Sequence, residues 1–195
     1  MSHTSFETFQ ELASRGTFVP VCKEIRADLL TPLSAFLKVA EHADHAFLFE
    51  SVEGGEQVAR YSFLGKDPFL VLRARDGLTL VDQDGVTTTE DVPFMDRLRG
   101  LMSDYRAPVV PGLPRFNGGL VGYFGYDSVR YFEPRLGPAR GEDVLQVPDI
   151  LLMRSEEVVV FDNLRGSLFL IVHVSPDAAD AVAGAEARLD ELERR

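Results

Sequence analysis

Residues 46–64 read AFLFESVEGGEQVARYSFL, and this stretch decides how the chain is expected to fold. Two apolar-rich runs of strand length flank Gly54-Gly55, which has the length and composition of a two-residue turn. Such a turn between two such runs is typical of a β-hairpin. With the glycines at the tip, Phe49 is expected opposite Arg60.

Turn signals and apolar runs on either side extend this pattern. Asp-Gly turns at 76–77 and 84–85 predict that the hairpin continues as a meander of about five strands over 46–89. Further strands are predicted at Ile150–Arg154, Val158–Asp162 and Ser167–Val174, and in the glycine-rich stretch 116–127 (FNGGLVGYFGYD). Glycines inside a strand indicate that another backbone approaches closely.

Helices are predicted between these strands. They should begin at the cap residues Thr4 and Thr31, lie between Val92 and Asp104, and cover Asp177–Arg195. In the helix after Thr31 the expected buried stripe is Leu33, Phe36, Leu37 and Ala40. Hairpins interrupted by helices favour an α+β fold built on antiparallel sheets with flanking helices.

The composition narrows the classes of function. Twenty basic against 31 acidic residues give a net charge of −11, which argues against binding to nucleic acid or to an anionic membrane. The longest apolar run, Leu168–Val172, is too short to span a bilayer, and the N-terminus lacks a signal-peptide pattern. We therefore expect a soluble, cytoplasmic chain.

No self-contained catalytic or metal site is predicted. The four histidines are scattered, no serine stands in a G-x-S-x-G elbow, and Cys22 is the only cysteine. The glycines of 116–127 fit neither the dinucleotide fingerprint nor the phosphate loop.

A candidate binding site begins at Glu50. This carboxylate directly follows three apolar strand residues, where burial is costly unless it gains a cationic or donor partner. Two interpretations stay open from the residues alone: an edge strand with Glu50 in water, or a site for a small cation-bearing ligand.

Four motifs resemble the N-terminal region of anthranilate synthase component I. They are FLFESVEGG at 47–55, RYSFLG at 60–65, the glycine-rich stretch 116–127, and VRYFE at 129–133. The resemblance extends from about Phe18 to Val174. It implies that residues 1–195 are a single N-terminal, regulatory domain and that the C-terminal chorismate-binding catalytic domain is absent. The fold implied is about half of an α/β/β/α orthogonal β-sandwich, with an apolar face exposed where the other half would pack.

The resemblance also implies a reaction. The family converts chorismate and ammonia to anthranilate and pyruvate, the first step of tryptophan biosynthesis, with Mg²⁺ as cofactor. A separate glutamine amidotransferase, component II, supplies the ammonia. Because the catalytic, metal-binding and chorismate-binding residues of the family lie in its C-terminal portion, this chain is assigned no catalytic residue, metal ligand or cofactor. By itself it is expected to be inactive.

The family's feedback site for L-tryptophan maps onto this chain through its Leu-Leu-Glu-Ser motif, which matches 48–51. Glu50 and Ser51 inherit the site, and Arg60 is the best match for its basic residue. Glu50 would accept from the ligand ammonium and Arg60 would pair with its carboxylate, while Phe49 or Tyr61 would pack on the indole.

Two other functions remain open from the sequence. One is the equivalent region of aminodeoxychorismate synthase component I or another chorismate enzyme. The other is a stand-alone amino-acid-binding or interaction module. Self-association of the chain across its exposed apolar face is a further expectation.

Overall fold

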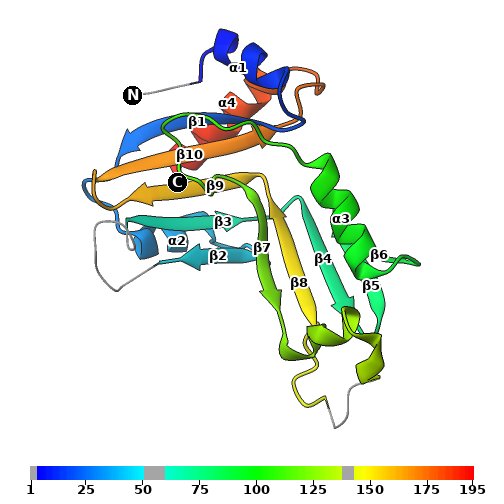
Figure 1. The fold of residues 1–195 in the computed structure, drawn as a ribbon. Helices are drawn as coiled ribbons and strands as arrows, with labels where there is room; N and C mark the ends of the chain where they lie inside the picture. The colour runs from blue at the N-terminus through cyan, green and yellow to red at the C-terminus, as the bar shows by residue number, and fades with distance from the viewer. Residues whose placement is uncertain (1–3, 51–59, 138–142) are drawn as a thin grey trace. The chain divides into compact units, whose positions relative to one another are not determined.

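The computed structural model describes residues 4–50, 60–137 and 143–195 (Figure 1). They form two five-stranded antiparallel sheets with flanking helices, which confirms the predicted α+β class. The chain divides into two compact units. The first unit is Met1–Pro68, Tyr105–Gly119 and Ser155–Arg195, and the second is Phe69–Asp104 and Leu120–Arg154.

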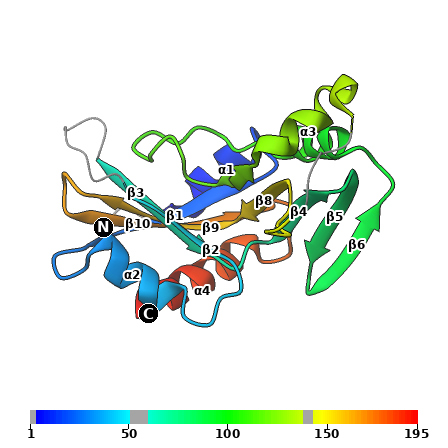
Figure 2. The same cartoon turned by 90° about the horizontal axis from the view of Figure 1, so that it is seen from below.

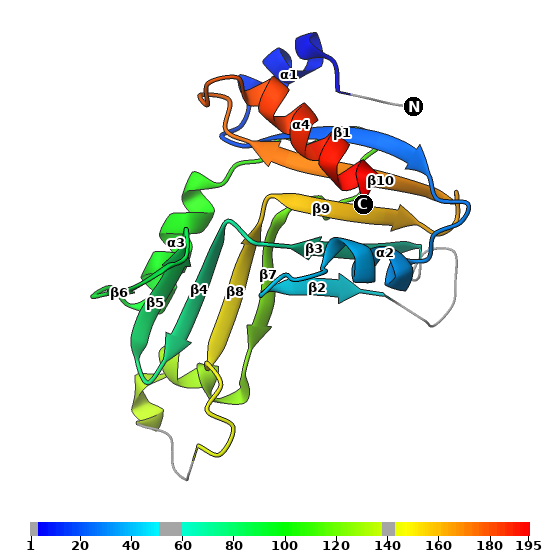
Figure 3. The ribbon, with the colours of Figure 1, turned by 180° about the vertical axis from the view of Figure 1, so that it is seen from behind.

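The first unit holds a sheet with the strand order β1-β10-β9-β3-β2. Its strands are β1 (Val19–Arg26), β2 (Ala46–Phe49), β3 (Tyr61–Lys66), β9 (Glu157–Asp162) and β10 (Ser167–Val174). Its helices are α1 (Phe6–Ala13), α2 (Pro32–Val39) and α4 (Ala181–Arg194). Helices α2 and α4 lie on the same face of this sheet (Figures 2 and 3).

Both faces of the first sheet are covered over its central strands. On the helical face, Leu64, Val159 and Leu170 share a core with Leu189 of α4. On the opposite face, Val158, Val160, Phe169 and Ile171 form a second cluster, against which Leu113 and Phe116 pack. Burial on two faces explains why β9 and β10 read as continuous apolar runs rather than as alternating ones.

The helix starts were predicted with mixed success. Thr31 caps α2 and Pro32 is its first residue, as predicted. Helix α1 is capped by Ser5, whose Oγ accepts from the Thr8 N–H at 3.2 Å, so the prediction of Thr4 as cap was wrong. The Thr4 hydroxyl instead accepts from the Cys22 N–H at 3.0 Å, which connects the start of the chain to β1.

The predicted stripe of α2 was partly wrong: Phe36 packs against the core as predicted, but Leu33 and Leu37 do not. Ala35 and Val39 are the buried residues of this helix, whereas Leu33 and Leu37 are 55% and 65% exposed. A helix of eight residues has little local pattern to fix its rotation, so packing against the sheet decides which side is buried.

The second unit holds a sheet with the order β6-β5-β4-β8-β7. Its strands are β4 (Leu70–Arg75), β5 (Leu78–Gln83), β6 (Val86–Glu90), β7 (Gly119–Phe124) and β8 (Ile150–Ser155), with helix α3 (Phe94–Asp104) and the 3₁₀ helices η1 (Tyr126–Tyr131) and η2 (Pro134–Leu136). Phe94 and Leu101 of α3 pack on Leu70, Leu72 and Leu152 of the sheet.

The predicted meander is divided between the two sheets. The Asp-Gly turns at 76–77 and 84–85 are confirmed, and both residues of each turn have positive φ, the type I′ geometry that suits tight hairpins. However, β3 pairs with β9 and β4 pairs with β8, so the strands on either side of Asp67-Pro68 belong to different sheets.

The predicted close approach of another backbone is confirmed at Gly122 and Gly125, whereas Gly118 meets side chains and nothing lies within 4 Å of a Cβ placed on Gly119. A Cβ on Gly122 would collide with the Leu151 carbonyl oxygen, and one on Gly125 would lie 2.9 Å from the Asp149 carbonyl oxygen. Gly118 lies against the ring of buried His173, whose Nε2 is 3.1 Å from the Asn117 Oδ1. Gly118, Gly122 and Gly125 are therefore points of close approach.

Candidate functional site

The predicted site begins where strand β2 ends. Phe49 is the last residue of this strand and is 51% exposed, although its ring lies 5.6 Å from that of buried Phe47. Glu50 follows with an exposed side chain. Ser51, the third residue of the motif, lies outside the described residues.

The register of β2 and β3 differs from the predicted one. Phe49 faces Phe63, so the prediction that it faces Arg60 was wrong by three residues. The pair of Phe47 with Gly65 explains the register, because a Cβ on Gly65 would lie 2.6 Å from the Phe47 ring. Only glycine leaves that space.

Arg60 is held by a partner that the sequence did not reveal. Its Nη2 lies 2.6 Å from the Oδ2 of Asp162, and its Nε donates to both carboxylate oxygens at 3.1 and 3.2 Å. Asp162 ends strand β9 and is 1% exposed, while the Arg60 side chain is 28% exposed. A hydrogen bond of 2.8 Å from the Asn163 N–H to the Arg60 carbonyl oxygen joins the same two segments.

Arg60 and Asp162 each stabilise the charged form of the other. Burial alone raises the pKa of the Asp162 carboxyl, but hydrogen bonds from Arg60 and from the N–H groups of Arg165 and Leu164 outweigh it and hold that pKa below its ordinary value. The hydrogen bond to Asp162 likewise raises the pKa of Arg60. Both groups therefore stay charged, and the guanidinium is fixed in place.

An aromatic row runs beside Arg60 on the sheet face opposite α2 and α4. The Arg60 guanidinium lies over the Tyr61 ring, 4.8 Å from its centroid. Tyr61 and Phe63 have centroids 6.1 Å apart, and Phe63 meets Phe116 edge-on at 5.3 Å. The structure thus brings Arg60 and Tyr61 into contact, and Phe63 connects them to Phe49 across the strand pair.

Phe63, Phe116 and Asp162 were not among the predicted site residues. Phe63 could have been found, because it follows Tyr61 by two positions and so shares its face of the strand. Phe116 and Asp162 come from segments more than 50 residues away, and only the tertiary fold places them here.

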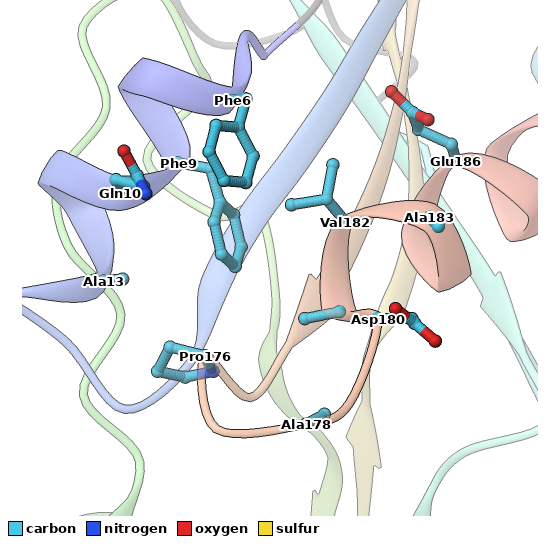
Figure 4. Close-up of a pocket in the computed structure, with 11 residues that line it drawn as sticks. Phe6, Phe9, Gln10, Ala13, Pro176, Ala178, Asp180, Val182, Ala183 and Glu186 are labelled. Atoms are coloured by element: carbon cyan, nitrogen blue, oxygen red, sulfur yellow. The ribbon is translucent and has the colours of Figure 1, made fainter.

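A separate groove lies between α1 and the start of α4 (Figure 4). Phe6, Phe9 and Val182 form its apolar part, and Asp180 and Glu186 lie at its edge. Of the predicted tryptophan-site residues that the structure describes, Phe49, Glu50, Arg60 and Tyr61, none lines it.

The described part of the chain shows no metal-ligand cluster and no membrane-spanning helix. There, no three His, Cys, Asp or Glu side chains gather as a set of metal ligands. None of the helices in residues 4–50, 60–137 and 143–195 has both the length and the apolar character needed to cross a bilayer.

Comparisons with known proteins give a consistent result, although no protein-family model matches the chain. Anthranilate synthase component 1 of Pseudomonas aeruginosa is 46% identical over 195 residues, and that of Acinetobacter calcoaceticus is 43% identical over 198. The protein of the same name from Acetivibrio thermocellus is 36% identical over 197 residues. These matches cover 97%, 98% and 100% of this chain but 39% of each relative.

The fold has a solved counterpart. A crystal structure of anthranilate synthase component I from Streptococcus pneumoniae superposes with a TM-score of 0.58 at 22% identity, over 87% of this chain and 35% of the other. The chain thus spans about 39% of the length of the curated relatives it matches. Over nearly all of its residues the chain is similar to part of anthranilate synthase component I, which confirms the resemblance found in the sequence motifs.

Proposed function

We propose that this chain is the N-terminal, regulatory part of an anthranilate synthase component I and carries most of its tryptophan feedback site. The observation that carries the proposal is the 36–46% identity to proteins of that name over almost every residue. The chain would contribute control, and the remaining three fifths of the protein would convert chorismate and ammonia to anthranilate and pyruvate.

The ligand proposed is L-tryptophan, held at the end of β2. Its ammonium would bind Glu50 and Ser51, and its indole would pack on Phe49 or Tyr61. The exposure of Phe49 and Glu50 supports this role, because an aromatic ring and a carboxylate at a strand end are both accessible to a ligand.

Arg60 is proposed to bind the ligand carboxylate while Asp162 holds it. A guanidinium carries five N–H donors in a planar fork, and Asp162 takes up the Nε–Nη2 edge. The edge that contains Nη1 would then face the ligand. In this arrangement Asp162 acts as a positioning residue, since it touches Arg60 and not the amino acid.

Regulation would follow from differential affinity. Tryptophan can inhibit only to the extent that it binds an inactive arrangement of the full-length protein more tightly than an active one. This chain by itself is proposed to be inactive, and Mg²⁺ is proposed to bind in the remaining part of the full-length protein. Component II, a glutamine amidotransferase, is the proposed source of ammonia, and the cytoplasm is the proposed location.

Binding to the isolated chain can be measured without background. The sequence contains no tryptophan, so excitation of the indole reports the ligand alone. We expect Glu50→Gln to weaken binding by about tenfold or more, because a hydrogen bond to a charged group is worth roughly 1.5–3 kcal/mol. The matched control Glu41→Gln changes an exposed glutamate that precedes β2 and should leave binding unchanged.

Regulation is tested in a full-length hybrid, in which this chain replaces the matching part of the Pseudomonas aeruginosa protein. Ser51→Phe and Glu50→Lys should relieve inhibition by tryptophan while anthranilate formation continues. Variants that stay fully tryptophan-sensitive would contradict the site. Release of pyruvate from chorismate by the 195-residue chain alone would contradict the proposal that this chain is inactive and that the remaining part of the protein carries out the reaction.

A further inference from the structure

In the second unit, the end of β7 and the start of β8 lie at the same end of the sheet (Figure 1). The segments at this end carry large apolar side chains that are exposed to solvent. We call this group the β7–η1 surface, and its members are 47% to 95% exposed: Phe124, Tyr126, Phe132, Leu136, Val144 and Leu145. Phe124 and Phe132 have ring centroids 6.4 Å apart, so the group includes neighbouring rings.

Hydrogen bonds hold this surface in a defined shape. The Gly125 N–H donates to the Asp149 carbonyl oxygen at 2.8 Å, which joins the end of β7 to the start of β8. The Tyr131 hydroxyl accepts from the Gly77 N–H at 3.2 Å and donates to the Asp149 carboxylate at 2.9 Å. Burial, together with the nearby carboxylate, raises the pKa of Tyr131 to about 12, so its proton stays in place at neutral pH.

The exposed side chains are not part of the unit's own core. That core consists of residues such as Leu72, Phe94 and Leu152, and the Tyr131 ring packs edge-on against Phe94 at 6.3 Å. Tyr131 thus connects η1 to the core, while Tyr126 at the other end of η1 is 95% exposed. A side chain that is so exposed contributes little to the stability of the isolated unit.

Two arginines near the surface have partners within the unit. Arg130 pairs with Asp127 at 3.0 Å and donates to the Gly137 carbonyl oxygen at 2.7 Å. Arg75 lies 3.3 Å from Asp143. The six members of the surface offer a partner apolar and aromatic area, which is typical of permanent interfaces, while Glu133 and Arg135 are exposed beside them.

We infer that the β7–η1 surface packs against the polypeptide that forms the other three fifths of the relatives' length. This inference rests on the proposed function. The relatives contain that additional polypeptide, because this chain matches 39% of each. A second copy of this chain fits less well, since each copy carries a net charge of −11 and the two would repel.

The test compares one substitution in two settings, the 195-residue chain and the full-length hybrid. Tyr126→Asp places a charge on a side chain that is 95% exposed in the chain, so its melting temperature should change by less than about 1 °C. In the hybrid the same charge would be buried in an interface, and the melting temperature should fall by several degrees. Leu29→Asp is the matched control, because Leu29 is 97% exposed in the first unit and should affect neither protein.

Hydrogen exchange gives a second readout that does not depend on the variant. Amides of 123–136 should exchange more slowly in the hybrid than in the chain. The aligned segment of the natural Pseudomonas aeruginosa protein should be protected too, which gives an answer even where the hybrid fails to fold.

Three results would overturn the inference. One is equal exchange in the chain and in the longer proteins. Another is a dimer of the isolated chain that Tyr126→Asp converts to monomer. The third is protection that appears only after component II is added. Anthranilate formation by the hybrid separates the two proposals: an active hybrid with an unprotected surface refutes this inference and leaves the proposed function standing.

Discussion

Replacing Asp162 by asparagine tests how the candidate site is held together. The substitution keeps the shape of the side chain and removes its charge. In the structure the carboxylate accepts from Arg60 at 2.6 Å and from the N–H groups of Leu164 and Arg165 at 3.2 Å each, at a position that is 1% exposed. The side-chain oxygen of asparagine can still accept from one set of donors, either Arg60 or the two backbone N–H groups. Its NH₂ group, which cannot accept, then faces the other set.

The expected cost follows from these contacts. A hydrogen bond between a charged donor and a carboxylate contributes roughly 1.5–3 kcal/mol to stability. The asparagine would keep some of the hydrogen bonds that Asp162 accepts from the backbone N–H groups of Leu164 and Arg165. We therefore expect the free energy of unfolding to fall by about 2 kcal/mol. For a chain of this size that corresponds to a melting temperature lower by roughly 4–8 °C.

The pH dependence has a definite sign. The pKa of Asp162 is lowered in the folded protein, so the charged carboxylate favours the folded state above the ordinary carboxyl pKa of about 3.9. This contribution is lost as the pH falls through the lower, folded-state pKa. The difference between the natural chain and Asp162→Asn should thus be constant from about pH 5 to 7 and shrink below about pH 4.

Urea unfolding followed by far-UV circular dichroism measures both quantities. Asp96→Asn is the matched control, because Asp96 is 60% exposed and pairs with Arg99 at the surface of α3, where we expect less than about 0.5 kcal/mol. The reasoning is refuted when Asp162→Asn is as stable as the natural chain at pH 7, or when the difference grows as the pH falls.

Three further tests probe the fold. Gly122→Ala should destabilise the second unit by about 1–3 kcal/mol in urea unfolding, because its methyl group meets the Leu151 carbonyl oxygen; a neutral result would contradict the close approach. Val39→Ala should cost about 2 kcal/mol and Leu37→Ala less than about 0.5 kcal/mol, and the reverse order would restore the stripe expected from the sequence. Burial raises the pKa of the Cys22 thiol, so a thiol reagent at neutral pH should react slowly with the folded chain and rapidly in urea.

Elements whose signals are local were predictable from the sequence. The Asp-Gly pairs at 76–77 and 84–85 dictate their turn type through backbone geometry alone, and both hairpins formed. Strands β9 and β10 are rich in apolar residues, many of them β-branched or aromatic, and both were predicted nearly to the residue.

Elements that depend on distant partners were not predictable. Strand β1 reads VPVCKEIR, a run with a proline and three charged residues, and the sequence did not predict it. It lies at the edge of its sheet, where proline is tolerated, and pairs with β10 about 150 residues later. The division of the meander into two sheets has the same cause, because β3 and β4 each find a partner beyond residue 149.

In the candidate site, too, contacts between side chains that are distant in the sequence could not be predicted. Phe49 and Glu50 were accessible to prediction because they follow one another in a motif. The partner of Arg60 was not, since Asp162 lies 102 residues away and reaches it only through the pairing of β3 with β9. The register predicted from the two-glycine turn was wrong because the packing of Phe47 against Gly65, on which the observed register depends, is not visible in the turn sequence.

The motifs that carried the resemblance are not, as a group, the residues that hold the core. In FLFES, Phe47 is buried while Phe49 and Glu50 are exposed, and in GYFGYD the tyrosine at 126 is 95% exposed. Folding alone gives no reason for aromatic side chains at such positions, because their loss would cost the isolated chain little. Contact with something outside these residues does give a reason: a ligand at the end of β2 and a polypeptide surface at the end of β7. The same physical argument thus links the two proposals, and Glu50→Gln and Tyr126→Asp test it separately.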